Sequence, residues 1–141
     1  MSGIAAIVPA VLDLLENSGH YTDAELRSAF SSAPFPAAPE KTTLIVGLGA
    51  AAVSGFSVGD RLDGSRLGKR LKASVKIQII SPLVLGAEQC TSVFNDLCGD
   101  LLFDSSLGAV SLTAGEVKCN TQRRAYEMTA ALVIDTLYYQ P

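Results

Sequence analysis

Apolar residues recur at helical spacing in two segments of the chain. In residues 4–16 they follow one helix face, and the run Asn-Ser-Gly at 17–19 then provides a stop signal. Pro9 falls inside this stripe, so the helix is expected to start near Val8 with Pro9 in its first turn. A second stripe lies in residues 86–103 and consists of Cys90, Val93, Phe94, Leu97, Cys98, Leu101 and Leu102. The pattern predicts an N-terminal helix and one long amphipathic helix.

Alternation with a period of two marks the strands. From residue 71 to residue 79 the odd positions are apolar and the even positions are polar, which is typical of a sheet covered on one face. The same alternation runs through residues 125–139. Shorter strands are predicted at residues 42–46, 53–58 and 110–118, with a polar hairpin turn at 120–122.

The order of these segments predicts an α+β fold. Residues 22–30 are expected to form a short helix with a capping box at Thr22 and Glu25. A Pro-rich connector at 31–40 and a Gly-rich, basic loop at 47–70 are expected to link the regular elements. We therefore expect one domain, residues 1–141, with a mainly antiparallel sheet and both helices packed on one of its faces.

Composition supports a single folded domain. The chain has 141 residues, of which 48% are hydrophobic and 18% are charged, so a mostly disordered chain is excluded. The longest uncharged run, residues 42–59, is rich in Gly and Ser and is a poor membrane helix. Residues 1–11 lack the basic start of a signal peptide. We expect a protein that is not embedded in a membrane and that is made in the cytosol.

Charge is divided into three blocks along the chain. Residues 1–60 carry a net charge of −4, residues 61–76 carry +5, and residues 77–141 carry −4. The basic block consists of Arg61, Arg66, Lys69, Arg70, Lys72 and Lys76. It is either a contact surface for DNA phosphates or an acidic protein ring, or an ordinary solvated loop and strand face. No aromatic residue lies inside this block, which disfavours base stacking on single strands.

A Gly-rich run is the main candidate for cofactor chemistry. Gly47, Gly49 and Ala52 match the dinucleotide fingerprint G-x-G-x-x-A after a predicted strand. A true fingerprint opens a helix, whereas the residues that follow disfavour one. A small nucleotide-binding enzyme that uses residues 47–52 is therefore kept as an alternative to a Gly-rich turn.

The other reactive side chains form no catalytic pattern. His20, the only histidine, is expected in a surface turn, and Cys90 and Cys98 are expected to pack in the core. Cys119 is expected to be exposed or half-buried beside a turn. Asp96 and Asp100 share a helix face, but a solvated face explains them better than a metal site. We therefore assign no catalytic residue, no metal ligand and no cofactor, and we expect a protein that is not an enzyme.

Short runs of residues carry a resemblance to a family of structural proteins. These are the Gly-rich segment after residues 42–49, GKRL at 68–71, Ser81-Pro82 ahead of GAEQC at 86–90, and GEVKC at 115–119. In their order the chain resembles the tail-terminator and neck-region (head–tail connector) proteins of tailed phages, prophages and phage-tail-like particles. The resemblance covers about residues 4–139.

The resemblance implies a structural virion protein. Such a protein forms a homo-oligomeric ring, commonly a hexamer, that caps the tail tube and joins it to the head-completion proteins of the neck. Its partners would be the tail tube protein, a head-completion or neck protein, and DNA in the lumen. It would reside in the tail or neck of a virion assembled in the cytoplasm of the bacterial host. A head–tail joining protein of the neck, or a monomeric adaptor that uses the same basic residues, stays an alternative.

Overall fold

The computed structural model describes residues 3–29, 39–62, 66–104 and 106–139, and along 56–62, 66–67 and at 139 it describes the backbone alone. The fold is α+β, as the sequence predicts. In chain order the elements are the 3-10 helix η1 (Ile4–Ala6), α1 (Ile7–Ser18), β1 (Glu25–Ser28), β2 (Thr43–Leu62), β3 (Arg66–Pro82), the 3-10 helix η2 (Leu83–Leu85), α2 (Glu88–Leu102), β4 (Ala109–Ala114), β5 (Lys118–Asn120) and β6 (Ala125–Tyr139).

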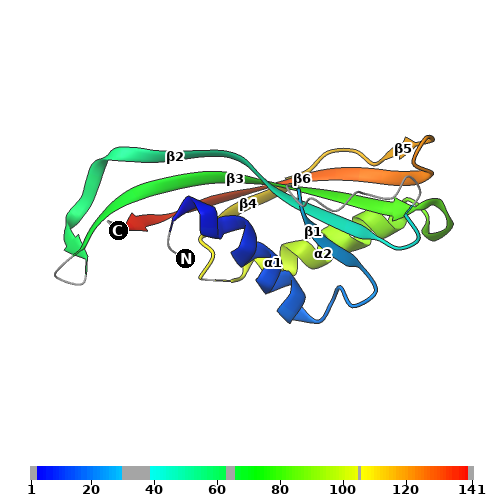
Figure 1. The fold of residues 1–141 in the computed structure, drawn as a ribbon, viewed down its shortest axis with the longest axis horizontal. Helices are drawn as coiled ribbons and strands as arrows, with labels where there is room; N and C mark the ends of the chain where they lie inside the picture. The colour runs from blue at the N-terminus through cyan, green and yellow to red at the C-terminus, as the bar shows by residue number, and fades with distance from the viewer. Residues whose placement is uncertain (1–2, 30–38, 63–65, 105, 140–141) are drawn as a thin grey trace.

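The described strands form one mixed sheet. Their order is β1-β2-β3-β6-β4, and β5 pairs with β6 beyond the end of β4. The pairing of β1 with β2 is parallel and all other described pairings are antiparallel. The three long strands β2, β3 and β6 therefore form the central part of the sheet and run along the long axis of the molecule, as Figure 1 shows.

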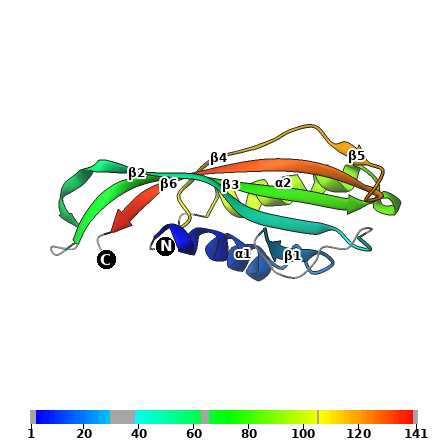
Figure 2. The same cartoon turned by 45° about the horizontal axis from the view of Figure 1, so that its top comes forward.

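The core lies on one face of the sheet. Figure 1 shows α1 and α2 below the long strands, and Figure 2 shows α1 beneath the sheet with α2 partly hidden behind β3 and β6. Each alternate residue of β3 points into this core, including Val75, Ile77 and Ile79, which are fully buried. The period of two in residues 71–79 is thereby confirmed, and so are both amphipathic helices. Pro9 lies in the first turn of α1, where its missing N–H costs no helical hydrogen bond.

The predicted helix at 22–30 is wrong, because residues 25–28 form the strand β1. The Glu25 backbone N–H donates to the Thr42 carbonyl at 2.8 Å, and the parallel ladder continues to Ser28 and Val46. An isolated helix of nine residues is marginal, whereas pairing with β2 satisfies the backbone and sets Leu26 against the core. The capping-box pattern at Thr22 and Glu25 was outweighed by this long-range pairing.

The predicted loop at 47–70 is also wrong over most of its length. β2 is continuous from Thr43 to Leu62, and β3 begins at Arg66. The Gly-rich run of β2 pairs with β3. Its pairing shifts register, as at a β-bulge, between Leu48 and Ala50, between Val53 and Ser57, and between Val58 and Leu62. The connector predicted at 31–40 lies mostly outside the described residues. The strand predicted at 110–118 is divided into β4 and the start of β5.

The far half of the β2–β3 hairpin projects from the helix-covered body. We call this part, residues 50–62 of β2 and 66–73 of β3, the arm. It extends to one side of the molecule in Figure 1, and its last segment pairs β2 with β3 alone, since the ladder of β3 with β6 ends at Gly68 and Tyr139. The described ends of the chain lie near each other on this side: a Cβ on Gly3 would be 4.0 Å from the Tyr138 ring.

Candidate functional site

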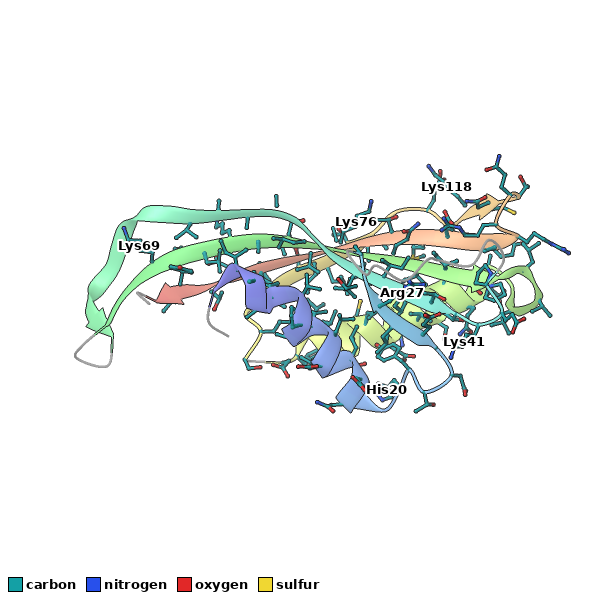
Figure 3. All side chains as sticks on the ribbon, viewed as in Figure 1. His20, Arg27, Lys41, Lys69, Lys76 and Lys118 are labelled. Carbon is teal, nitrogen blue, oxygen red and sulfur yellow. The ribbon has the colours of Figure 1, made fainter. Side chains whose placement is uncertain are left out.

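The basic residues of the block at 61–76 do not form one compact patch. Lys69 lies out on the arm and Lys76 near the middle of the sheet, as Figure 3 shows. Arg70, Lys72 and Lys76 occupy alternate positions of β3 and share the sheet face opposite the helices. The side chains of Arg61 and Arg66 lie outside the described part, although both residues belong to the arm.

Two of these cations are bound within the arm and its base. The Lys69 ammonium donates to the Gly55 carbonyl at 2.9 Å, which ties β3 to β2. The Arg70 guanidinium donates to both carboxylate oxygens of Asp135 on β6, with distances of 2.9, 3.2 and 2.8 Å. These bonds, with a smaller contribution from the nearby Lys72, lower the pKa of the Asp135 carboxyl. The Lys69 contact therefore links β3 to β2, and the Arg70 contact links β3 to β6.

An apolar groove lies on the helix side of the sheet, between α1 and the β1 edge. It has a volume of about 830 Å³. Its lining comes from η1, α1, β1 and β2 and consists of Ile4, Ala5, Val8, Pro9, Leu12, Asp13, Glu16, Leu26, Ser28 and Leu48. A cleft of this size and apolar character is the kind of surface that binds a ligand or a peptide segment.

The rim of this groove is acidic. Asp13 and Glu16 are exposed on the outer turns of α1, and residues 3–24 contain no Lys or Arg. Neither carboxylate takes part in an ion pair with any described side chain. The arrangement favours an occupant that combines apolar side chains with positive charge.

The sheet has an uncharged stretch at each of its edges. β1 pairs only with residues 43–46 of β2, and from Gly47 onward β3 is the only strand partner of β2 among the described residues. Residues 42–59 contain no charge and no Pro, the usual devices that protect a free edge. On the opposite side β4 pairs with β6 alone within the same described part, and it too is uncharged.

Close approach of the backbone explains one glycine at this edge. The Ala29 N–H donates to the Val46 carbonyl at 2.8 Å, and a Cβ on Gly47 would lie only 2.7 Å from the Ala29 Cβ. The absence of a side chain at Gly47 therefore leaves room for the Ala29 side chain at the end of β1. This role is different from the phosphate contact that the G-x-G-x-x-A pattern suggested.

The dinucleotide fingerprint at 47–52 is contradicted by the structure. Gly47, Gly49 and Ala52 lie in the middle of β2, whereas a fingerprint turn must join a strand to a helix N-terminus. The next element along the chain is β3, paired antiparallel, so the backbone N–H groups do not converge on a phosphate. The alternative of a nucleotide-binding enzyme loses its only motif.

His20 contacts a carboxylate that is distant in the sequence. Its Nδ1 lies 3.0 Å from Asp100 Oδ2, and the Tyr21 hydroxyl donates to the same oxygen at 2.8 Å. The hydrogen bond and charge of Asp100 raise the pKa of His20 above its ordinary 6.5, and burial with Asp100 raises the pKa of Tyr21. The cluster joins the turn after α1 to α2, and no nucleophile is among its members.

The cysteines occupy three different environments. Cys90 is fully buried, as predicted, and burial raises the pKa of its thiol. Cys98 is half-buried and its pKa is raised for the same reason, so both thiols are held protonated. Cys119 is an exposed free thiol at β5.

The residues described contain no group of three or more acidic, His or Cys side chains that could hold a metal ion. Asp100, one of the helical carboxylate pair, is engaged by His20 and Tyr21 instead. No described helix is long and apolar enough to cross a membrane.

Sequence reasoning missed the groove because it depends on β1. With residues 22–30 assigned to a helix, no surface could be placed beside α1. The alternation of Leu26 and Ser28 with charged neighbours Glu25 and Arg27 was the available signal for a strand with one face turned to α1.

A search against models of known protein families finds no match for this chain, and a search of curated proteins finds none either.

Proposed function

We propose that this chain is a ring-forming structural subunit of the tail-terminator type, which caps the tail tube of a phage or phage-tail-like particle and joins it to the neck. The observation that carries the proposal is the sheet with an uncharged stretch at each edge, residues 47–59 of β2 on one side and β4 on the other. The edge of β2 beyond Gly47 differs from the edge of β4, so copies can join head to tail, as in a closed ring.

The arm supports the same proposal. The β2 strand of the arm offers an exposed surface that a single copy does not need for its own core, whereas Leu71 and Ala73 on the β3 strand of the arm are buried. Ala50, Ala51 and Val53 on this arm are exposed, although they follow directly on the buried base of β2. The resemblance of the sequence to terminator and neck proteins agrees with a protein that acts through such surfaces.

The direct test is the mass of the purified chain by light scattering, followed by negative-stain imaging, alone and with preformed tail-tube polymer. We expect hexameric rings, either free or at the ends of tubes. A chain that stays monomeric under both conditions contradicts the proposal. A monomer that binds one neck component in equal stoichiometry would instead support the adaptor alternative.

A variant tests the role of the β2 edge. Ala51→Lys places a charge on the exposed part of the strand, where it opposes pairing with another chain. We expect the ring fraction to fall while the circular dichroism spectrum is unchanged. Gln122→Lys, in the exposed turn after β5, is the matched control and should leave rings intact.

A further inference from the structure

The groove beside α1 has an apolar end. Ile4, Val8 and Leu12 lie on successive turns of η1 and α1, and Leu26 and Leu48 complete this part of the lining from β1 and β2. All five side chains are half-buried, so each keeps part of its apolar surface for an occupant. The lining runs along the helix from residue 4 to residue 16, which corresponds to a length of roughly 18 Å.

The opposite end of the groove is negative for two reasons. Asp13 and Glu16 continue the lining toward the C-terminal end of α1, and both are exposed. Glu16 lies in the last turn of α1, which contains no basic residue, and the dipole of a helix is negative at its C-terminal end. The two carboxylates and the dipole therefore act together, and they favour a cation at this end of the groove.

The described part of the chain supplies no cation to this end. The groove lining, α1 and α2 contain no Lys or Arg. Arg27 of β1 alternates with Leu26 and Ser28, which line the groove, so its side chain points to the other face of the sheet. A positive charge that neutralises Asp13 and Glu16 must therefore come from another molecule.

We propose that this groove binds a basic amphipathic helix of a partner protein. The apolar side chains of that helix pack against Val8, Leu12 and Leu26, and its Lys or Arg side chains contact Asp13 and Glu16. The turns of α1 repeat about every 5.4 Å, and a second helix of about three turns presents apolar side chains at the same interval.

This binding site is separate from the sheet edges to which we assign ring formation. The groove lies beside α1, whereas the edges belong to β4 and to β2 beyond Gly47. The inference therefore goes beyond the proposed function, and either of the two can fail while the other stands.

Titration with defined peptides tests the chemistry of the occupant. The probe is a fluorescent synthetic peptide of Leu and Lys in which Leu recurs at helical spacing, and its anisotropy is followed as the full chain is added. We expect saturable binding, and at least about tenfold weaker binding when every Lys is replaced by Glu or every Leu by Ala. Absence of saturable binding by the Leu-Lys peptide would overturn the inference, and so would equal binding by the peptide without Leu.

Two matched double variants locate the site. Asp13→Asn/Glu16→Gln should weaken binding of the Leu-Lys peptide by about tenfold and reduce its dependence on salt. Glu88→Gln/Asp96→Asn removes the same charge from α2, which contributes no residue to the lining, and should weaken binding by less than about twofold. Val8→Thr keeps the shape of the side chain but adds a hydroxyl to the apolar end, so it should also weaken binding. Equal weakening by the two double variants would overturn the placement in the groove.

The direction of the bound helix provides an independent measurement. In a peptide with its Lys residues clustered at one end, a spin label at that end should broaden the amide NMR signals around Glu16 more than those around Ile4. A label at the apolar end should reverse this order. Broadening that is equal at both ends of the groove, or that is centred on α2, would contradict the inference.

Discussion

The base and the arm of the β2–β3 hairpin share one secondary structure and differ in what covers them. At the base, Leu44, Val46 and Ile77 are fully buried under α1 and α2. On the arm, residues 50–52 are exposed and Val53 retains 37% of its surface. The same ladder of backbone hydrogen bonds therefore runs through a buried base and an arm whose β2 strand is exposed, although Leu71 and Ala73 on the β3 strand of the arm stay buried.

The difference teaches where function can be changed without loss of the fold. Side chains at the base contribute through apolar burial, which is the largest favourable term in folding. Side chains on the arm contribute mainly through strand pairing and contacts such as Lys69 with Gly55. Substitutions at the base, and at the buried Leu71 and Ala73 of the arm, should change stability, and substitutions at the exposed positions of the arm should change assembly.

The largest contrast should come from truncation of one side chain in each region. Ile77→Ala removes a fully buried side chain and is expected to lower the free energy of unfolding by about 2–5 kcal/mol. Val53→Ala on the arm should lower it by only about 0.5 kcal/mol. Urea denaturation followed by circular dichroism measures both. Similar losses in the two variants would mean that the arm is part of the cooperative core.

Alanine substitutions at two glycines of β2 compare how closely the base and the arm are packed. Gly47→Ala at the base forces a Cβ against Ala29 and should cost about 1–3 kcal/mol. Gly55→Ala on the arm meets no atom within 4 Å and should be neutral or stabilising by about 0.5 kcal/mol. Thermal unfolding of the two variants gives the sign of each effect, and a destabilised Gly55→Ala would contradict the openness of the arm.

A smaller effect on the free energy of unfolding is expected from the His20–Asp100 ion pair. Because the pKa of His20 is raised in the folded state, the Asp100 contact stabilises the fold below pH 6.5 and is lost as the pH rises through the folded pKa. The difference in unfolding free energy between wild type and His20→Gln should therefore be largest below pH 6.5 and shrink as the pH rises above it. Tyr21→Phe, which removes no group that titrates in this window, should show a roughly constant loss.

The smallest effect, and one of opposite direction, is expected near the arm. The pKa of Asp135 is lowered from 3.8 by Arg70, so this pair stabilises the fold above the ordinary carboxyl range and is lost as the pH falls through the lowered value. Asp135→Asn should be less stable than wild type at about pH 6, and the difference should shrink as the pH falls below 3.8. A difference that persists in acid would assign the stabilisation to the hydrogen bonds alone.

Local periodicity was sufficient to predict most of the body. The alternation through residues 71–79 and 125–139, and the helical stripes that became α1 and α2, all reflect burial against one core. These patterns repeat over many residues, so a single exception such as Pro9 does not obscure them. The fold class follows from them directly.

The edge strands and the groove could not be predicted in the same way. β1 has only four residues and is defined by its pairing with β2, which local preference does not encode. The β2 part of the arm is a strand in spite of its glycines, because β3 pairs with it along its length and the register shifts at its irregular points. The contact of His20 with Asp100 joins residues 80 positions apart, and no spacing rule connects them.

The closeness of the described chain ends has a practical consequence for engineering. Since Gly3 lies beside Tyr138, a short linker could join the ends, and the exposed turn between β5 and β6 could then serve as the new opening in a circular permutant. The described ends, Gly3 and Tyr139, lie on the side of the molecule from which the arm projects, so tags fused next to them would start on that side (Figure 1). A permutant would move such a tag to the opposite end of the sheet, where an affinity resin could capture the protein without obstructing the arm.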